Sequence, residues 1–468
     1  MDFQFKRIAD PVHGTIGLSE LEVRLIHCGA YQRLRNIKQL GLAHLVFPAA
    51  DYSRFAHSIG VCHVTGRLLN ALQRHELFKG NAEEVGRETQ RYRLAALCHD
   101  LGHYPFSHAM EVAVKNHYSG GLLKTDLKGD GMDSLHHEEV SELVIQKDPG
   151  ISAVLTAGGF SADDIAAIFR RRDPPPFANL ISSDLDADRI DYLLRTAHHT
   201  GLPYGHVDLD YIVSQMRLDS EGRLAVARQA MRSAEHLLLC RFFDYQQVSY
   251  HKTVAALELV LKDVLGGLLD LGVLDCSAST VETMIESESW QTFDDARILA
   301  MIAALAANTT VPKVMSLKAQ ALLTRNVPKL CGEVEYFGRR SDFEKFSKEV
   351  ESVKKESAKW AAAADLPGEL MYVWDQKTTV TKAGTSVPFD ADAGEEEDKL
   401  QQAVRVLGRD NKTSRPISQC ENSLMRAMSD QVLFGIRVYA LIPPGQTKAR
   451  AAVSQAIEES PLRVLPWK

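Results

Sequence analysis

The sequence lacks the features that would place it in a membrane or among disulfide-bonded secreted proteins. No apolar run is long enough to span a bilayer, and the N-terminal stretch 1–6 lacks the apolar region of a signal peptide. The seven cysteines are odd in number and dispersed, and none forms a C-x-x-C pair, so we expect reduced thiols in a reducing compartment. An excess of positive charge is also missing. The net charge of −7 gives no indication of a nucleic-acid binder, although a local basic pocket is compatible with that balance.

The composition is that of an ordinary globular protein, with enough hydrophobic residues to form a large core. Its 468 residues are 45% hydrophobic and 25% charged, which is enough for two to four domains or for one large helical domain with an appendage. We see no internal repeats. These numbers predict a cytoplasmic globular protein that does not enter a membrane.

The pattern of the first 325 residues is mainly helical. A turn and a short strand are predicted over 8–18, and Ser19 with Glu22 forms a capping box that starts a helix. The basic stretch 32–40 is predicted to be a helix that ends at Gly41, either as a solvated face or as an anion-binding surface. Residues 215–226 indicate a hairpin, and apolar helices fill most of 230–325.

The composition shifts near residue 326, where we place a domain boundary. Predicted strands at 334–337, 370–374 and 435–442 and helices at 341–362 and 446–459 make residues 326–468 a small α+β region. The polar stretch 375–398, with its acidic run, is predicted to be disordered.

The segment from Leu94 to His103 carries the first candidate chemistry. An apolar helical run ends there in His99 and Asp100, and Gly102 follows. An imidazole and a carboxylate at a helix end can bind the same Zn, Fe or Mn ion. The dipeptide alone is a weak signal. The same is true of His57, because a lone histidine among apolar residues is more often a core residue than a ligand.

Carboxylates gather in a second unusual stretch, from Asp184 to Asp191. Asp184 and Asp188 are spaced to share one face of a helix, where like charges cost a few tenths of a kcal/mol per pair. A metal ion, or a neighbouring arginine at 189 or 195, would relieve that repulsion. An acidic first helical turn is the structural alternative, and it also explains the glutamates after His136 and His137.

In chain order, His57, His99, Asp100 and Asp188 give the pattern H…HD…D, which resembles the HD-domain metal-dependent phosphohydrolases. The resemblance is closest to the SAM-and-HD-domain deoxynucleoside triphosphate triphosphohydrolases and their bacterial relatives, and it covers residues 8–260. Further matching motifs are Asp10–Gly14, Gln32–Arg35, Ile37–Gly41, Val46–Pro48, Arg54–Gly60, Cys98–His103, Pro105–His108, Asp186–Tyr192 and His198–His199 with Gly201. Because the match begins almost at Met1, we expect no SAM domain.

The resemblance implies a mainly α fold, with an HD-domain helical core, small β hairpins and the C-terminal α+β appendage. It also implies one or two divalent ions (Mg, Mn, Fe or Zn) held by His57, His99, Asp100 and Asp188. Such an ion lowers the pKa of water and neutralises phosphate charge. By resemblance, His103 and His137 handle protons on the leaving oxygen, since the pKa of histidine lies near neutral pH. Glu111 orients the proton-handling histidine.

Substrate contacts are also implied by the resemblance. The matching positions, which would hold the nucleotide, are Arg54, Gln39, His108, Arg189, Tyr192 and Arg241, and Arg35 matches a regulatory anion site. The sugar-contacting aromatic of the family falls at Ser249 and a nearby histidine at Tyr245, with Tyr250 one residue away. The acidic residue that reads an activating guanine falls at His27. Sugar selection and activation by GTP are therefore expected to differ from the family pattern.

We therefore predict a metal-dependent phosphohydrolase that acts on nucleotides and forms a homo-oligomer (dimer, tetramer or hexamer). The expected reaction is hydrolysis of deoxynucleoside triphosphates to nucleoside and tripolyphosphate. One alternative is a phosphomonoesterase or phosphodiesterase of the same superfamily that acts on other nucleotides or nucleic-acid ends. An alternative of another class is a nucleotide-binding regulatory or defence subunit.

Overall fold

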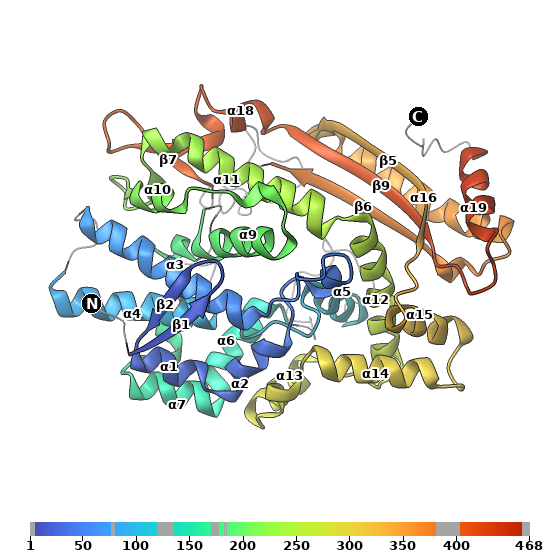
Figure 1. The fold of residues 1–468 in the computed structure, drawn as a ribbon, viewed down its shortest axis with the longest axis horizontal. Coiled ribbons are helices and arrows are strands. Elements are labelled where there is room, and N and C mark those ends of the chain that lie inside the picture. The colour runs from blue at the N-terminus through green and yellow to red at the C-terminus, as the bar shows by residue number, and fades with distance from the viewer. Residues whose placement is uncertain are drawn as a thin grey trace.

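The computed structural model describes residues 5–75, 80–118, 135–169, 177–181, 183, 185–380 and 403–460. Helices dominate these residues and the strands form small sheets, so the mainly α fold class is confirmed (Figure 1). The α-helices are α1 (Glu20–Ile26), α2 (Gly29–Gln32), α3 (Arg54–Arg74), α4 (Ala82–Cys98), α5 (His108–Tyr118), α6 (His137–Lys147), α7 (Pro149–Ala157), α8 (Ala162–Ala166), α9 (Ala187–Thr200), α10 (Leu209–Ser214), α11 (Met231–Asp244), α12 (Lys252–Asp270), α13 (Ala278–Glu286), α14 (Asp295–Ala307), α15 (Lys313–Leu323), α16 (Phe343–Ala363), α18 (Leu424–Met428) and α19 (Ala449–Glu458). The strands are β1 (Lys6–Asp10), β2 (Gly14–Leu18), β3 (Met216–Leu218), β4 (Leu224–Val226), β5 (Lys329–Arg339), β6 (Met371–Thr379), β7 (Arg405–Leu407), β8 (Ser414–Pro416) and β9 (Gln431–Ala440).

Three helices frame the region that contains the predicted site. Helix α3 packs against both α4 and α9, and most of its side chains are buried, which explains why apolar residues surround His57 on all sides. Ser53 caps the start of α3 by accepting a hydrogen bond from the Ala56 amide. Helix α4 ends at Cys98, so the chain turns away immediately after His99.

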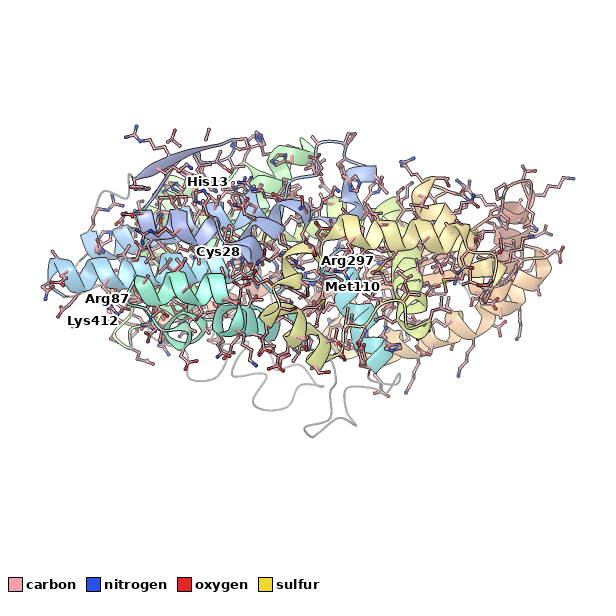
Figure 2. The ribbon with its side chains drawn as sticks, turned by 90° about the horizontal axis from the view of Figure 1, so that it is seen from below. His13, Cys28, Arg87, Met110, Arg297 and Lys412 are labelled. Carbon is pink, nitrogen blue, oxygen red and sulfur yellow. The ribbon has the colours of Figure 1, made fainter. Side chains whose placement is uncertain are left out.

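The predicted capping box forms at the N-terminal end, and the predicted short strand pairs with a second strand in a hairpin that was not predicted. Strands β1 and β2 pair antiparallel, with Ile8 opposite Ile16. Gly14 adopts a positive φ of 74° in the turn between them. Ser19 then caps α1 in the predicted box with Glu22. In the view of Figure 2, this hairpin, with His13 in its turn, lies along one face of the molecule.

The prediction of a basic helix over 32–40 is wrong. Helix α2 ends at Gln32, a 3-10 turn spans Arg33–Asn36, and the chain is extended at Ile37. Arg33 is buried, and its guanidinium donates hydrogen bonds to the backbone carbonyls of Leu101, His103 and Phe293. These long-range contacts determine the path of the segment, and Arg33 is not available as a surface anion ligand.

The C-terminal strands form an antiparallel sheet in the order β5-β9-β6 (Figure 1). Helix α16 packs against β6 and β9, and α19 packs against β5. A separate apolar core lies between these helices and the sheet, with Phe346 and Phe434 at a ring-centroid distance of 4.7 Å. Part of the stretch predicted to be disordered, residues 375–379, belongs to β6, where it pairs with β9. Residues 381–398 lie outside the described residues.

A second sheet joins the two predicted regions. Its order is β3-β4-β7-β8, and β4 pairs in parallel with β7 through Val226 and Val406. Tyr372 and Leu441 also belong to the main core. The boundary predicted near residue 326 therefore separates two regions that share a sheet and part of one core. No described helix combines the length and apolar character needed to cross a bilayer.

Candidate metal centre and active-site cavity

The structure brings the four predicted metal ligands together at the ends of three helices. His57 lies on α3, His99 and Asp100 directly follow α4, and Asp188 lies in the first turn of α9. His57 Nε2 is 2.9 Å from Asp188 Oδ1 and 3.9 Å from Asp100 Oδ2. His99 Nε2 is 3.2 Å from Asp100 Oδ1 and 3.8 Å from Asp188 Oδ1. His57, His99 and Asp188 each offer a ligand atom within 4.8 Å of the others, so these three could hold one ion, and Asp100 lies beside them.

The two imidazole rings are held with the same nitrogen toward the centre. His99 Nδ1 donates to the Ala96 carbonyl at 2.7 Å, and His57 Nδ1 donates to Asp191 Oδ2 at 2.8 Å. In a neutral ring each Nε2 then carries a lone pair. Both Nε2 atoms are buried and make no hydrogen bond with the described residues. Two lone pairs that face two carboxylates fit a divalent cation, which this donor set suits.

The charge balance at His57 also favours a cation. Burial opposes a charge on His57, but the contacts with Asp188 and Asp191 outweigh it and raise the pKa of His57 to about 10. The same balance, with the signs of the charges reversed, holds at Asp100. Burial opposes its charge, yet Arg54, His99 and the neighbouring His103 together hold the pKa of Asp100 well below its usual range. The carboxylate is therefore ionised at neutral pH and can act as a ligand.

A second layer of buried polar residues supports His57. Asp191 Oδ1 accepts from His13 Nε2 at 2.7 Å, and Arg195 donates to both oxygens of Asp191 at 2.8 and 2.9 Å. Arg195 also reaches Asp10 Oδ2 at 2.8 Å, while Asp10 Oδ1 accepts from the backbone amide of His13. The β1–β2 turn is thereby joined to α9, behind the metal centre. Such outer contacts fix the orientation of a ligand imidazole.

The predicted proton-handling residues form a second cluster next to the metal centre. Glu111 Oε1 lies 3.0 Å from His137 Nδ1 and 3.0 Å from His136 Nδ1, and Glu111 Oε2 lies 3.2 Å from His108 Nδ1. Burial favours a protonated Glu111, but these three histidines outweigh it and strongly lower its pKa. The His103 and His137 rings stack at a centroid distance of 4.1 Å. The carboxylate of Glu111 therefore orients His137, as the resemblance implied, and it also contacts His136.

His103 lies between the two clusters. Its Nε2 is 3.3 Å from Asp100 Oδ1. Burial, together with the positive charges of Arg54 and His137, lowers the pKa of His103 well below its usual value, even though Asp100 opposes the shift. His103 is consequently neutral near pH 7, so it can accept a proton.

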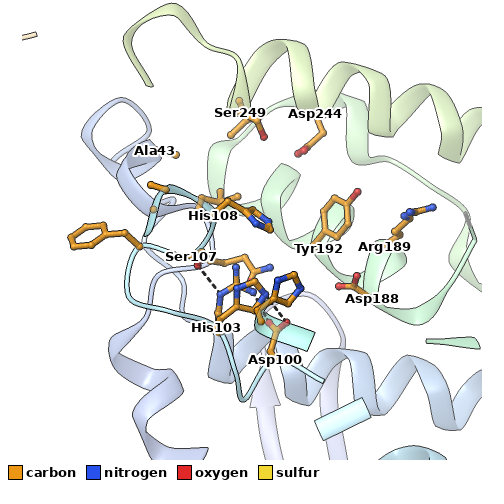
Figure 3. A pocket seen from close by; sticks show the side chains of 18 of the residues that line it. Ala43, Asp100, His103, Ser107, His108, Asp188, Arg189, Tyr192, Asp244 and Ser249 are labelled. Carbon is orange, nitrogen blue, oxygen red and sulfur yellow. Dashed lines mark hydrogen bonds and ion pairs between the residues drawn. The ribbon is translucent and has the colours of Figure 1, made fainter. Parts of the chain in front are cut away.

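Both clusters open into a cavity of about 620 Å³, which is large enough for a nucleotide. Figure 3 shows Asp100, His103 and Asp188 at one side of it, His108 and Tyr192 between, and Asp244 and Ser249 at the opposite side. The predicted residues that line it are Gln39, Arg54, His99, Asp100, His103, His108, His137, Asp188, Arg189 and Tyr192. Arg54, which is buried, donates to Asp100 Oδ2 at 2.7 Å and to Ser107 Oγ at 2.9 Å. Gln39 leaves its buried Oε1 without a hydrogen bond to a described residue.

Some predicted residues lie away from the cavity. Arg241 is not among its lining residues, and its guanidinium lies 5.6 Å from the centroid of the Tyr245 ring. Arg35 is exposed, stacks over Phe55 at 3.6 Å and donates to Gln32. Of the predicted acidic helix face, Asp184 lies outside the described residues, and α9 begins only at Ala187.

Several polar residues around the site were not predicted from the sequence. In the sequence, Asp191 counted only as one of the clustered carboxylates and Arg195 only as a neighbouring positive charge. Their i,i+4 spacing nevertheless indicates an ion pair on one helix face. His13 belongs to a motif quoted for the resemblance, but nothing in the sequence shows that it reaches α9. Asp244 and Glu258 line the cavity from α11 and α12. No local pattern marks either residue, because their position depends on how these helices pack.

The comparisons with known proteins agree with this geometry. A family model described as the HD domain matches residues 54–196, which contain all four predicted metal ligands. The chain is 34% identical over 263 residues to the uncharacterized protein YwfO of Bacillus subtilis, covering 56% of this chain and 55% of that protein. It is 25% identical to the human deoxynucleoside triphosphate triphosphohydrolase SAMHD1, covering 75% of this chain and 59% of that protein.

A solved structure shares nearly the whole fold. The crystal structure of a hypothetical protein from Aquifex aeolicus superimposes with a TM-score of 0.68 at 26% identity, over 96% of this chain and 99% of that chain. The chain spans a little over half the length of YwfO and of human SAMHD1. Residues 54–196 are thus an HD domain, and the chain is related to the branch of HD-domain proteins that includes SAMHD1.

Proposed function

We propose that this protein is a metal-dependent phosphohydrolase that cleaves deoxynucleoside triphosphates into nucleoside and tripolyphosphate. One observation carries the proposal: two buried imidazole nitrogens, which have no hydrogen-bond partner in the described part of the chain, face two carboxylates at one side of a nucleotide-sized cavity. A divalent cation bound there would neutralise phosphate charge and lower the pKa of water. The ligands would be His57, His99, Asp100 and Asp188. The relationship to proteins named as triphosphohydrolases supports the choice of substrate.

The residues beside the metal centre would bind the phosphates and manage protons. Arg54 and Arg189 line the cavity and supply guanidinium groups suited to phosphate oxygens. When water attacks the α-phosphorus, the bond to the 5′ oxygen breaks and that oxygen needs a proton. His137 is placed to supply it from Nε2, because Glu111 occupies Nδ1. His103 is neutral and stacked on His137, so it positions that ring and can accept a proton.

The decisive experiment is product analysis. The protein is incubated with Mg²⁺ or Mn²⁺ and each ribo- and deoxynucleoside triphosphate, and the products are separated by ion exchange and identified by ³¹P NMR. We expect nucleoside and tripolyphosphate from the deoxynucleotides. The control is Asp210→Ala, which removes an exposed carboxylate on α10 and should keep the activity.

The other outcomes identify the alternatives. Release of orthophosphate or pyrophosphate would contradict the triphosphohydrolase assignment and favour a different phosphohydrolase of the superfamily. Bound metal without turnover of any nucleotide would favour a regulatory nucleotide-binding subunit. The predicted homo-oligomer is a separate proposal, and light scattering of the purified protein tests it.

A further inference from the structure

The wall of the cavity opposite the metal centre contains a buried carboxyl group that the proposed chemistry does not use. Asp244 is the last residue of α11, and a π-helical turn, Tyr245–Ser249, follows it. Such turns inside helices are frequent at functional sites. Asp244 is only 4% exposed, yet it lines the cavity, and Figure 3 shows its carboxyl group pointing into the space beside Tyr192.

Only one of the two carboxyl oxygens has a protein partner. Oδ1 of Asp244 accepts a hydrogen bond from the Tyr204 hydroxyl at 2.6 Å, and Oδ2 accepts none from the described residues. Two other buried carboxylates, those of Asp295 and Asp191, use both oxygens, although Asp148 also leaves its Oδ2 without a partner among the described residues. Asp295 accepts from the Lys38 and Phe106 amides, and Asp191 accepts on both of its oxygens.

Oδ2 faces the cavity, so a bound ligand can reach it. Burial raises the pKa of Asp244 to about 7, even though the Tyr204 hydroxyl and the charge of Arg241 oppose the shift. Asp244 therefore presents to the cavity an acceptor oxygen that no described residue uses, which is the arrangement expected where a ligand supplies the donor.

The charges of the cavity indicate which part of a nucleotide meets Asp244. The phosphates belong near Arg54 and the metal ligands, and they would be repelled by a carboxylate. The nucleoside must then extend toward the opposite wall, past Tyr192, which lies between the two sides in Figure 3. Tyr245 and Tyr250, which follow Asp244 in the chain, also line the cavity and offer aromatic faces to a base or sugar. Nucleosides carry donors of both kinds, N–H groups on the base and O–H groups on the sugar.

We infer that Asp244 determines specificity by accepting a hydrogen bond, through Oδ2, from an N–H or O–H donor of the nucleoside. The inference rests on the proposed function and deepens it, because it assigns the residue that reads the nucleoside. Tyr204 acts as a positioning residue, since its hydroxyl fixes Oδ1 and leaves Oδ2 toward the cavity.

The test measures binding, so that it does not depend on turnover. Triphosphates in which CH₂ replaces the 5′ oxygen are titrated calorimetrically into the metal-loaded protein. One series varies the sugar (ribose, 2′-deoxyribose, 2′,3′-dideoxyribose), and the other varies the base (guanine, hypoxanthine, adenine, thymine). Wild type is compared with Asp244→Ala and Asp244→Asn, and circular dichroism and thermal melting establish that each variant is folded. Tyr204→Phe is the matched control, because it removes the hydroxyl and keeps the carboxyl group.

The expected result is selective. Asp244→Ala should weaken binding about 10-fold or more for ligands that carry the recognised donor, and it should leave unchanged the analogue that lacks this donor. The analogue that escapes the effect identifies the donor as a sugar hydroxyl or a base N–H. Tyr204→Phe should lower affinity less and keep the ranking of ligands. An equal loss for all ligands, or no loss for any, would overturn the inference while the product analysis could still support the proposed function. Absence of nucleotide binding to wild type would overturn both.

Discussion

The HD domain and the C-terminal α+β region bury very different side chains. The sheet β5-β9-β6 with α16 and α19 encloses a core made of apolar residues such as Phe346, Trp360 and Phe434. The HD domain also has a large apolar core, but its centre contains His57, Asp100 and Asp191, all almost fully buried. Burying polar groups costs free energy unless each one has a partner. The difference teaches that the HD domain gives up stability to keep a prearranged site of charged residues, whereas the buried polar residues of the C-terminal region, such as Gln376 and Thr378, are uncharged.

The largest expected effect comes from removing a metal ligand. His99→Ala or Asp188→Ala should abolish turnover and metal binding, because each removes a ligand atom on which the other three depend. Neither change should unfold the protein. Loss of Asp188 relieves repulsion between carboxylates, and the His99 side chain makes a single hydrogen bond with the described residues, to the Ala96 carbonyl. Metal content by atomic emission, turnover and circular dichroism check the three statements.

The control for these variants is Asp210→Ala, which removes an exposed carboxylate of α10 that forms an ion pair with Arg67 of α3. It should change neither metal content nor turnover. Full activity of an Asp188→Ala protein shown to be free of metal would contradict the metal-centre assignment.

A smaller effect, on metal affinity, is expected from the buried residues that hold the ligand His57 in place. His13→Ala removes one of the two donors to Asp191 Oδ1, the other being Arg195, so Asp191 and then His57 become less well oriented. Loss of such an outer contact typically costs 10–100-fold in metal affinity. Competition with a chelator measures that affinity, and melting of the metal-free protein measures stability. His13→Gln keeps an N–H donor and should recover part of the affinity. Unchanged metal affinity in His13→Ala would show that Asp191 is held by Arg195 alone.

The same contrast explains what could be predicted from the sequence. Helical periodicity, capping residues and alternating strands depend on neighbours in the chain, so α1, the β3–β4 hairpin, α16 and β9 were predictable. The order of His57, His99, Asp100 and Asp188 allowed the site to be assembled by resemblance before any geometry was known. The basic segment around Arg33 was misread because its conformation depends on carbonyls 68–260 positions away. Asp244 was missed for a related reason: its partner Tyr204 lies 40 residues away and its role depends on a cavity.

In the C-terminal region we expect a change in stability with little change in chemistry. Phe434 packs against Phe346, Phe343 and Tyr336. Truncation of such a buried aromatic to alanine lowers the free energy of unfolding by about 3–5 kcal/mol. Phe434→Ala should therefore melt at a lower temperature and yet, below its transition, turn over substrate at a rate close to wild type. A large loss of kcat in folded Phe434→Ala would show that the two regions are coupled beyond their shared sheet.

The last expected effect is on the pH dependence of stability and leaves the chemistry aside. It arises from Asp244, a buried carboxyl group whose Oδ1 is bonded to Tyr204 and whose Oδ2 faces the cavity. Its pKa is about 7 in the folded protein, compared with 3.8 for an ordinary aspartate. Between these values the folded state holds a proton that the unfolded state has released, so the contribution of Asp244 to stability falls as the pH rises and levels off above pH 7. The slope is at most about 1.4 kcal/mol per pH unit. Asp244→Asn does not titrate and can still accept from Tyr204. Its stability relative to wild type should therefore increase from pH 4 to pH 7 and then stay constant, as measured by urea unfolding of the metal-free proteins. A difference that does not vary with pH would mean that Asp244 is already ionised in the folded protein, and that the cavity wall carries a full negative charge.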